Sequence, residues 1–319
     1  MLSVDLNCDL GESFGAYTIG MDEQVIPLIT SANVACGYHA GDPMVMRRTV
    51  ELCHEHGVSV GAHPGFPDLV GFGRRNLAVT PAEAKACVQY QIGALQAFCR
   101  AVGLPLRHVK PHGALYNMAA KDAALARALV EGIAEIDDGL VLLALSNSEM
   151  LAAAEAKGLP CKSEVFADRG YRGDGTLVPR REPGAMITDE NEAIARVVRM
   201  VRAGVVTSVD GTDVPLRADS VCVHGDGAKA LLFVEKIRAA LAEAEIEVKA
   251  FWEETWQDDM SCSPRRAIWS ACRRRCASAR TPSISAGRSC SCARAAWAFP
   301  WRTWSRRSAR RTASEGACT

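Results

Sequence analysis

The chain has 319 residues, with 37 basic and 37 acidic side chains, so its formal net charge is zero. This balance hides two unlike segments, because residues 252–319 carry 13 arginines against five acidic residues, which leaves 24 basic and 32 acidic residues in 1–251. The acidic body excludes a basic nucleic-acid-binding surface as its main feature. Its length fits one large α/β domain, such as a β/α barrel.

Residues 252–319 have a composition unlike that of a folded domain. They contain all six tryptophans and six of the thirteen cysteines, but no leucine, valine, lysine or histidine. Out-of-frame translation of GC-rich coding sequence gives arginine, alanine, serine, cysteine, tryptophan and proline in this way. We therefore predict a folded catalytic body at 1–251 and an out-of-frame, disordered tail at 252–319, and we infer function from the body alone.

The cysteines and the apolar runs of the body predict its cellular compartment. Its seven cysteines are scattered, odd in number and without a C-x-x-C pair. That pattern favours reduced thiols over a disulfide framework. The sequence shows no basic-then-apolar leader and no apolar run near the roughly 20 residues of a membrane span. We expect a cytoplasmic protein that does not associate with membranes.

Short apolar runs alternate with amphipathic helical stretches along the body. Several runs are almost continuously apolar, as is typical of buried parallel strands. The predicted strands are 4–8, 32–36, 58–62, 106–110, 139–145, 161–166 and 220–223.

The predicted helices between these strands carry recognisable start and stop signals. The first covers 43–56 and ends at Gly57. The next begins at Thr80-Pro81, where Glu83 completes a capping box, and another capping box is predicted from Ser146 to Glu149. Two later helices are predicted over 189–204 and 226–244, and between them 207–217 forms a hairpin with Asp-Gly at its tip.

About seven strand–helix units in sequence predict either a closed parallel barrel or a doubly wound sheet. Polar clusters follow nearly every strand and not just two of them, so we prefer the barrel. The carboxyl ends of barrel strands meet on one face, where active sites are built. The polar residues that follow the strands are Asn7, Asp9, Glu12, His39, His63, Lys110, His112, Asn117, Asp168, Arg169, His224 and Asp226.

These residues allow more than one chemistry. Asp9, His39 and His63 suit zinc or another divalent ion, but they equally suit a metal-free acid–base set. Lys110, Arg169 or the pair Arg74-Arg75 could hold a carboxylate or a phosphate. The sequence contains no P-loop and no nucleophile elbow.

Several long motifs of the body closely resemble the LamB/YcsF family. The resemblance covers essentially residues 2–251 and leaves the tail outside. The motifs lie at 5–15, 33–43, 61–65, 109–117, 166–171 and 223–226.

The resemblance implies a seven-stranded β/α (TIM-like) barrel of the glycoside hydrolase/deacetylase type. It also implies ATP-dependent hydrolysis of 5-oxo-L-proline (pyroglutamate) to L-glutamate, with ATP converted to ADP and phosphate. The expected cofactor is ATP, with Mg²⁺ as its metal, and the expected partners are two further 5-oxoprolinase subunits, B and C. Two alternatives stay open: a metal-dependent deacetylase or carbohydrate hydrolase on the same barrel, and a non-catalytic binding subunit.

We assign expected roles to the polar residues on this basis. The residues expected to be catalytic are Asp9, His39, His63, Lys110 and His112. The residues expected to bind substrate are Asn7, Glu12, Asn117, Asp168, Arg169, His224 and Asp226. If a metal is bound, its expected ligands are Asp9, His39 and His63.

Overall fold

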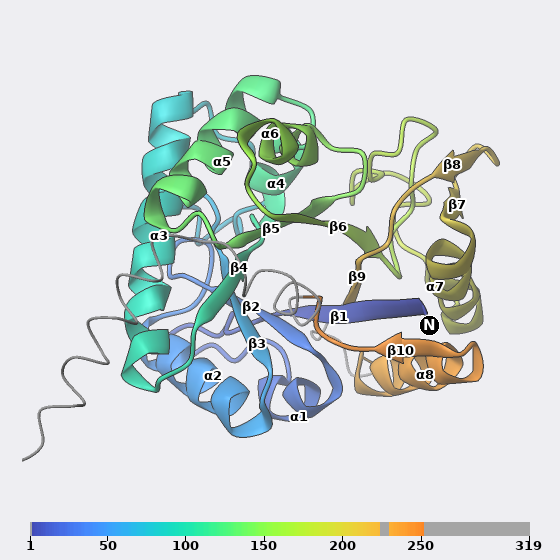
Figure 1. Cartoon of the computed structure of the whole chain (residues 1–319), viewed down its shortest axis with the longest axis horizontal. Helices are drawn as coiled ribbons and strands as arrows, with labels where there is room; N and C mark the ends of the chain where they lie inside the picture. Colours follow the sequence, from blue (N-terminus) through green and yellow to red (C-terminus); the bar gives the residue numbers. More distant parts are fainter. Residues whose placement is uncertain (1, 224–229, 252–319) are drawn as a thin grey trace, which may run out of the picture. The chain divides into compact units, whose positions relative to one another are not determined.

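The computed structural model describes residues 2–223 and 230–251, in which seven parallel strands close into a barrel (Figure 1). Neighbouring strands pair in chain order, and the pairing of β1 with β9 closes the ring. The predicted seven-stranded barrel is therefore confirmed. Its strands are β1 (Leu2–Leu10), β2 (Ser31–Ala35), β3 (Ser59–His63), β4 (Leu106–Val109), β5 (Val141–Leu145), β6 (Cys161–Phe166) and β9 (Ser220–Val223).

Three further strands lie outside the closed ring. β10 (Ile246–Val248), which was not predicted, pairs in parallel with the first residues of β1. β7 (Val205–Thr207) and β8 (Asp213–Pro215) form the predicted antiparallel hairpin. Gly211 in its turn has φ +84°, a conformation that glycine adopts without steric cost.

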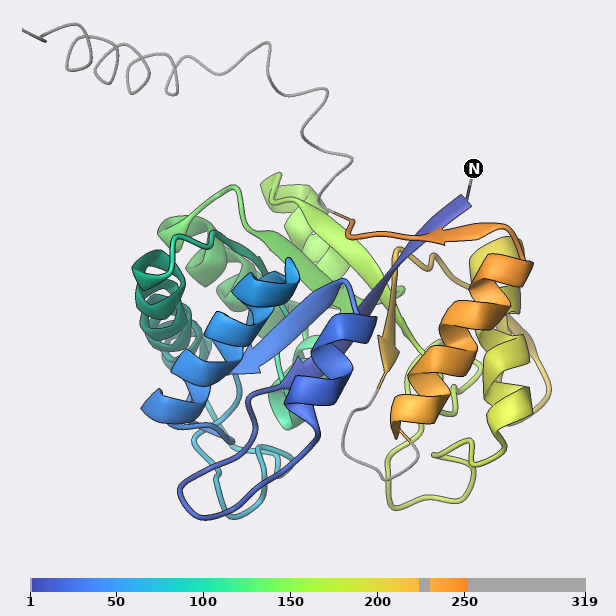
Figure 2. The same cartoon turned by 90° about the horizontal axis from the view of Figure 1, so that it is seen from below.

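Helices surround the outside of the barrel, as the two views at right angles show (Figures 1 and 2). No helix within the described residues is both long and apolar enough to cross a membrane. The helices are α1 (Asp22–Val25), the 3₁₀ turn η1 (Ile26–Leu28), α2 (Pro43–His56), α3 (Pro81–Ala101), α4 (Gly113–Ala119), α5 (Ala123–Ile136), α6 (Glu149–Lys157), α7 (Glu190–Ala203) and α8 (Ala230–Glu243).

Most predicted helix ends are confirmed. Thr80 and Glu83 form the capping box of α3, and the left-handed Gly57 ends α2. The predicted capping box at Ser146 is wrong, because α6 has Ser148 as its N-cap residue. The Ser146 hydroxyl instead accepts a hydrogen bond from the backbone N–H of Arg217, at 3.1 Å.

Helices α4 and α5 fall between the predicted strands 106–110 and 139–145 and were not predicted separately. The predicted helix 226–244 is confirmed from Ala230 onward, whereas 226–229 lie outside the described residues.

Polar side chains line the inside of the barrel along β1. Leu6, Cys8 and Leu10 belong to the apolar core, whereas the alternate residues Asp5 and Asn7 bond to polar groups of neighbouring strands. Successive side chains of a strand point to opposite faces, so one face of β1 packs on helices and the other faces the barrel axis. The barrel interior is thus a hydrogen-bonded column and not only a packed apolar core.

Asp5 predicts an unusual dependence of stability on pH. Burial raises its pKa from 3.8 to about 6, although the hydroxyl groups of Ser220, Ser31 and Thr30 oppose this. The folded protein therefore holds the proton more tightly than the unfolded chain does. The contribution of Asp5 to the free energy of unfolding should fall as the pH rises from about 4 to about 6, and stay level above that.

The substitution Asp5→Asn removes the ionisable group. It should raise the free energy of unfolding by about 3 kcal/mol above pH 6 and leave that free energy nearly unchanged below pH 4. Urea unfolding of both proteins at about pH 4 and about pH 7 measures the difference. An equal difference between the two proteins at both pH values would contradict the assignment.

Phe251 covers the amino-terminal end of the barrel. Its side chain is buried and packs against Val141 and Leu143 of β5, and its ring meets His108 of β4 edge-on at 5.5 Å. The predicted end of the body at residue 251 thus coincides with a side chain that belongs to the core.

A chain stopped after Phe251 is expected to melt at the same temperature as the whole chain or higher, because residues 252–319 contain no leucine or valine with which to build a core. Phe251→Ala within the shortened chain should cost about 3–5 kcal/mol by removing a buried ring. Thermal melting of the three proteins measures both effects. A large loss of stability on truncation would refute the division at residue 251.

Candidate functional site

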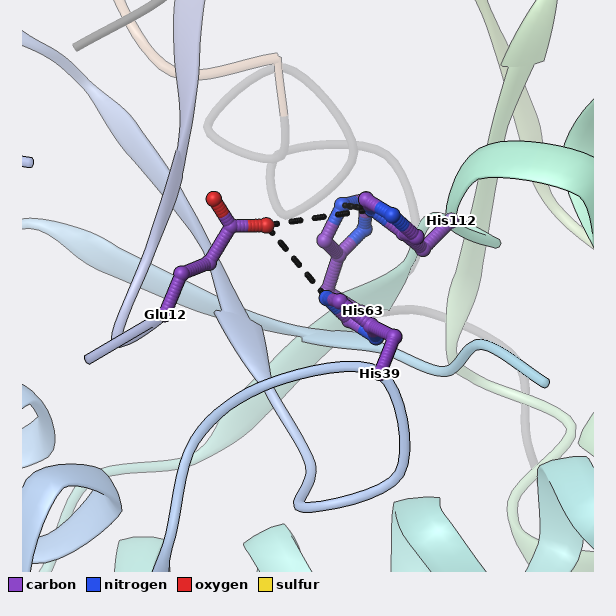
Figure 3. A group of neighbouring side chains, drawn as sticks. All are labelled: Glu12, His39, His63 and His112. Atoms are coloured by element: carbon purple, nitrogen blue, oxygen red, sulfur yellow. Dashed lines mark hydrogen bonds and ion pairs between the residues drawn. The ribbon is translucent and has the colours of Figure 1, made fainter. Parts of the chain in front are cut away.

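Four ionisable side chains meet at the carboxyl end of the barrel (Figure 3). Glu12 follows β1, His39 lies between β2 and α2, His63 ends β3, and His112 is the N-cap residue of α4. Each offers one ligand atom, and these atoms all lie within 4.8 Å of one another. We call these four residues the imidazole cluster.

His63 and His112 make three short polar contacts through their ring nitrogens, but two neutral rings have only two N–H groups to share among them. His63 Nδ1 lies 2.7 Å from the backbone oxygen of Lys110, and His112 Nε2 lies 2.9 Å from that of Phe72. The facing nitrogens, His63 Nε2 and His112 Nδ1, are 3.0 Å apart. Two neutral imidazoles carry two N–H groups, which cannot satisfy three such contacts. A proton or a metal ion between the rings would resolve this conflict.

A proton between the two rings is less favourable than a metal ion. Burial, together with the neighbouring imidazoles His39 and His63, holds the pKa of His112 well below its usual 6.5. Burial and His63 likewise lower the pKa of His39, whose ring stacks on that of His112 at 3.7 Å. Neutral imidazole is the form that binds metals.

The donor set of the imidazole cluster fits a divalent metal ion. Three imidazole nitrogens and one carboxylate oxygen are ligands that zinc and related ions accept. The carbonyl oxygens of Lys110 and Phe72 lie behind His63 and His112, where ligating histidines usually donate their second N–H. Glu12 Oε1 lies 3.3 Å from His39 Nε2 and 3.8 Å from His112 Nδ1, and it supplies the negative charge.

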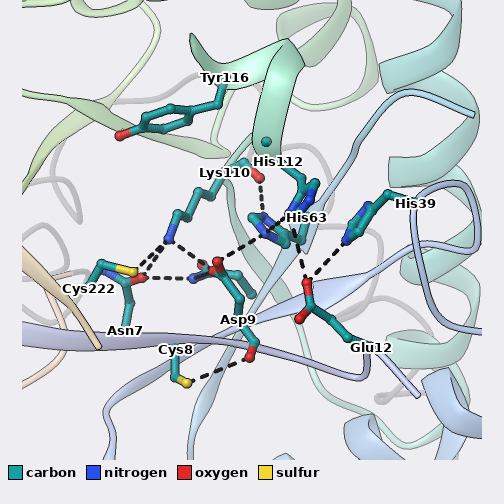
Figure 4. Close-up of polar contacts among 12 residues, drawn as sticks. Asn7, Cys8, Asp9, Glu12, His39, His63, Lys110, His112, Tyr116 and Cys222 are labelled. Atoms are coloured by element: carbon teal, nitrogen blue, oxygen red, sulfur yellow. Dashed lines mark hydrogen bonds and ion pairs between the residues drawn. The ribbon is translucent and has the colours of Figure 1, made fainter. Parts of the chain in front are cut away.

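Lys110 forms the centre of a second polar group beside the imidazole cluster (Figure 4). Its ammonium nitrogen lies 2.9 Å from Asp9, 2.7 Å from Glu164, 3.1 Å from the side-chain oxygen of Asn7 and 3.2 Å from the sulfur of Cys222. Burial alone would lower the pKa of Lys110, but Asp9, Cys222 and Glu164 outweigh it and raise that pKa well above its usual value. Lys110 is therefore a permanent buried cation.

Asp9 connects the two groups. One carboxylate oxygen bonds to Lys110 at 2.9 Å, and the other lies 3.3 Å from His63 Nε2. Asn33 holds the first oxygen through its side-chain amide, at 2.9 Å. The mouth of the barrel thus carries a connected set of acids, imidazoles and one ammonium group, which is the equipment of acid–base chemistry.

The structure brings most of the predicted site residues together. Glu12, which we expected to bind substrate, lies among the imidazoles where we expected Asp9 as a third ligand. The predicted residues that lie in the two connected groups are Asn7, Asp9, Glu12, His39, His63, Lys110 and His112.

Other predicted site residues have different surroundings. The guanidinium of Arg169 is buried and donates to the backbone oxygens of Ala185 and Val178, so it anchors its own loop. Asn117 is exposed on α4 and donates to the backbone oxygen of Gly113. The backbone oxygen of Asp168 accepts from Ile187. His224 and Asp226 lie outside the described residues.

Sequence reasoning missed Glu164, which is fully buried on β6. Its carboxylate accepts a hydrogen bond from the Tyr116 hydroxyl at 2.7 Å and pairs with Lys110. A charged residue inside an otherwise buried strand is a signal that could have revealed it. Asn33 of β2, which donates to both Asn7 and Asp9, is likewise a polar residue inside a buried strand.

Comparison with known proteins identifies the family of the chain. The sequence profile of the LamB/YcsF family matches residues 4–255. A protein from Clostridium beijerinckii, named as the A subunit of 5-oxoprolinase, is 63% identical over 248 residues, which cover 78% of this chain and 97% of that protein. The Bacillus subtilis protein of the same name is 56% identical over 254 residues, covering 80% of this chain and 99% of that one.

A solved structure shares the fold as well as the sequence. The lactam utilization protein from Thermus thermophilus superposes with a TM-score of 0.74 at 48% sequence identity, over 78% of this chain and all of that one. The profile match and these relatives span the barrel and both polar groups at its mouth. The chain therefore belongs to the LamB/YcsF family.

Proposed function

We propose that this chain is a subunit of an ATP-dependent 5-oxoprolinase, which hydrolyses 5-oxo-L-proline to L-glutamate. The observation that carries the proposal is the polar mouth of the barrel, with its imidazole cluster and its buried Lys110. Relatives named as the A subunit of 5-oxoprolinase match this chain over nearly their whole length. The reducing cytoplasm is the compartment we propose, since the seven cysteines of the described residues form no disulfide.

The proposed reaction needs ATP because a five-membered lactam is a stable amide. Transfer of the terminal phosphoryl group of ATP to the amide oxygen creates a leaving group and an electrophilic carbon. Addition of water to that carbon breaks the ring C–N bond and gives an acyl phosphate of glutamate. A second water molecule then displaces phosphate and leaves the free carboxylate.

The side chains at the mouth suit the steps that involve water. The lowered pKa values of His39 and His112 keep both rings neutral, which is the form in which imidazole binds a metal ion. Asp9 lies 3.3 Å from His63 and is held by Lys110, which orients the carboxylate toward that ring. We propose that Asp9 is the acid–base group when the three histidines hold a metal ion, and that Asp9 and the histidines share this role in a metal-free site. Lys110 holds Asp9 in place in both cases.

A divalent ion at this mouth would be held by Glu12, His39, His63 and His112. Such an ion acts as a Lewis acid and polarises a carbonyl or phosphoryl oxygen. We propose that Asn7, Asn117, Asp168, His224 and Asp226 contribute to substrate binding, whereas Arg169 holds its own loop.

The chain alone is expected to open little 5-oxoproline. Its sequence has no P-loop to hold ATP, and its relatives are named as one of several subunits. Combined with partner subunits B and C, it should form one glutamate for each ATP hydrolysed. Assays that omit each subunit in turn measure this requirement. Robust ATP-coupled turnover by the purified single chain would refute the need for partners.

The imidazole cluster itself favours one other function, that of a metal-dependent deacetylase or carbohydrate hydrolase. Hydrolysis by such an enzyme proceeds without ATP. Release of acetate from acetylated sugars by the metal-loaded chain, in the absence of nucleotide, would support this second function over the first.

A further inference from the structure

Residues 68–75, between β3 and α3, form a loop beside the imidazole cluster, and we call it the 68–75 loop. Phe72 in this loop has φ +53°, in the left-handed region that bulky side chains rarely adopt. Strained backbone of this kind concentrates at functional sites, where the surrounding structure enforces it. The contacts of Phe72 show what its conformation achieves.

Phe72 touches two of the clustered imidazoles through different groups. Its backbone oxygen lies 2.9 Å from His112 Nε2. Its ring meets His39 and His112 edge-on, with centroids 5.7 and 5.3 Å apart. The guanidinium of Arg74 lies over the same ring at 4.9 Å. The backbone therefore presents an acceptor to one side of His112, and the ring limits the movement of both imidazoles.

The rest of the loop holds Phe72 in this conformation. The buried carboxylate of Asp68 accepts from the backbone N–H of Gly71 at 3.0 Å and forms an ion pair with Arg75. The backbone oxygen of Asp68 accepts from Gly73 at 2.8 Å. A side chain at Gly73 would lie only 2.7 Å from His39, so glycine is needed for this close approach.

The backbone oxygen of Phe72 competes with His63 for the single proton of neutral His112. If that proton sat on Nδ1, it would bond to His63 Nε2, 3.0 Å away, and both facing nitrogens would be closed to a ligand. With the proton on Nε2, directed to Phe72, His112 Nδ1 and His63 Nε2 both keep free lone pairs. In the metal-free protein the hydrogen bond to Phe72 must then outweigh the repulsion between these two lone pairs.

We propose that the 68–75 loop is a positioning element that selects the Nε2–H tautomer of His112 and so keeps the cluster open to a cation. Phe72 and Asp68 act through His112 and are positioning residues. The proposal rests on the imidazole cluster being the metal centre of the proposed function, but the tautomer itself can be read in the metal-free protein.

The test uses the full chain labelled with ¹⁵N-histidine and stripped of metal. Long-range ¹H–¹⁵N spectra distinguish protonated from unprotonated ring nitrogens, and His112→Gln identifies the signals of that ring. The wild-type protein should show His112 protonated at Nε2. In Asp68→Ala, which releases the loop without touching an imidazole, the proton should move to Nδ1.

Phe72→Gly is the second variant, because glycine moves freely between positive and negative φ and no longer fixes the carbonyl direction. It should give the same shift of the proton. Asp174→Ala is the matched control: this carboxylate also holds a loop, through the N–H and hydroxyl of Thr176, and contacts no residue of the cluster. The control should keep the wild-type tautomer.

Cobalt(II) titration provides the second readout. Loss of a group that orients a metal-ligating histidine typically weakens metal binding about 10- to 100-fold, and we expect that loss in Asp68→Ala and Phe72→Gly. A wild-type His112 protonated at Nδ1, or variants that keep the Nε2 proton, would overturn the proposal. If no variant or wild type bound cobalt while the tautomer moved as expected, the positioning role would stand and the metal role would fail.

Discussion

His63→Ala is expected to abolish tight binding of a divalent metal ion. The imidazole lies in the middle of the site: it is 3.0 Å from His112 and 3.3 Å from Asp9. Loss of a group behind a ligand costs about 10- to 100-fold in affinity, so loss of the ligand itself should cost at least about 100-fold. Cobalt(II) absorption, and metal content after dialysis against zinc, measure the loss.

The matched control is His54→Ala, because His54 is an exposed histidine in the last turn of α2 and belongs to neither polar group. It should bind the same amount of metal as the unmodified chain. Equal affinity of the His63 variant and the His54 variant would contradict the assignment of the metal centre. Melting temperatures of both variants establish that the barrel is folded in each case.

Lys110→Met is expected to cost about 3–5 kcal/mol of unfolding free energy, because it leaves two carboxylates near the barrel axis without their cation. Glu164 is fully buried, and Asp9 is largely so. Methionine preserves most of the side-chain volume, which limits the cavity contribution. The double variant Lys110→Met, Glu164→Gln should recover part of the loss, since it removes one of the two stranded charges. Urea unfolding measures all three proteins.

Lys85 provides the control for this prediction. It also lies between two carboxylates, 2.6 Å from Glu135 and 3.6 Å from Glu131, but on the protein surface. Exposed ion pairs contribute little because solvent screens them, so Lys85→Met should leave stability almost unchanged. If the Lys110 and Lys85 substitutions cost the same, the buried network would not stabilise the barrel as we describe.

The barrel was predictable from sequence because its signals are local. Apolar runs marked each of the seven strands, and the ends of α2 and α3 carried capping signals at Gly57 and Thr80 that the structure confirms. A similar capping signal at Ser146 led to a wrong prediction, because α6 has Ser148 as its N-cap residue. A capping box depends on where the helix begins, and a tertiary bond to Arg217 decides the position of that side chain.

The site was predictable only in outline. Residues after strands converge in any β/α barrel, so the grouping of His39, His63 and His112 followed from their spacing. Which carboxylate joins them depends on loop geometry: the structure places Glu12 among the three histidines, whereas Asp9 lies between His63 and Lys110. Arg169 carried the same positional signal, yet backbone oxygens of its own loop bind its guanidinium.

The central claim is that 5-oxoproline is opened at the mouth of this barrel. The most direct test is glutamate formation by the complete complex, with ATP and subunits B and C, in which this chain is either unmodified or carries His63→Ala. We expect the variant complex to assemble but to lose glutamate formation by at least about a thousandfold, since the substitution removes a side chain that serves the site either as a metal ligand or as an acid–base group. An assembled variant complex that forms glutamate at the unmodified rate would contradict the account.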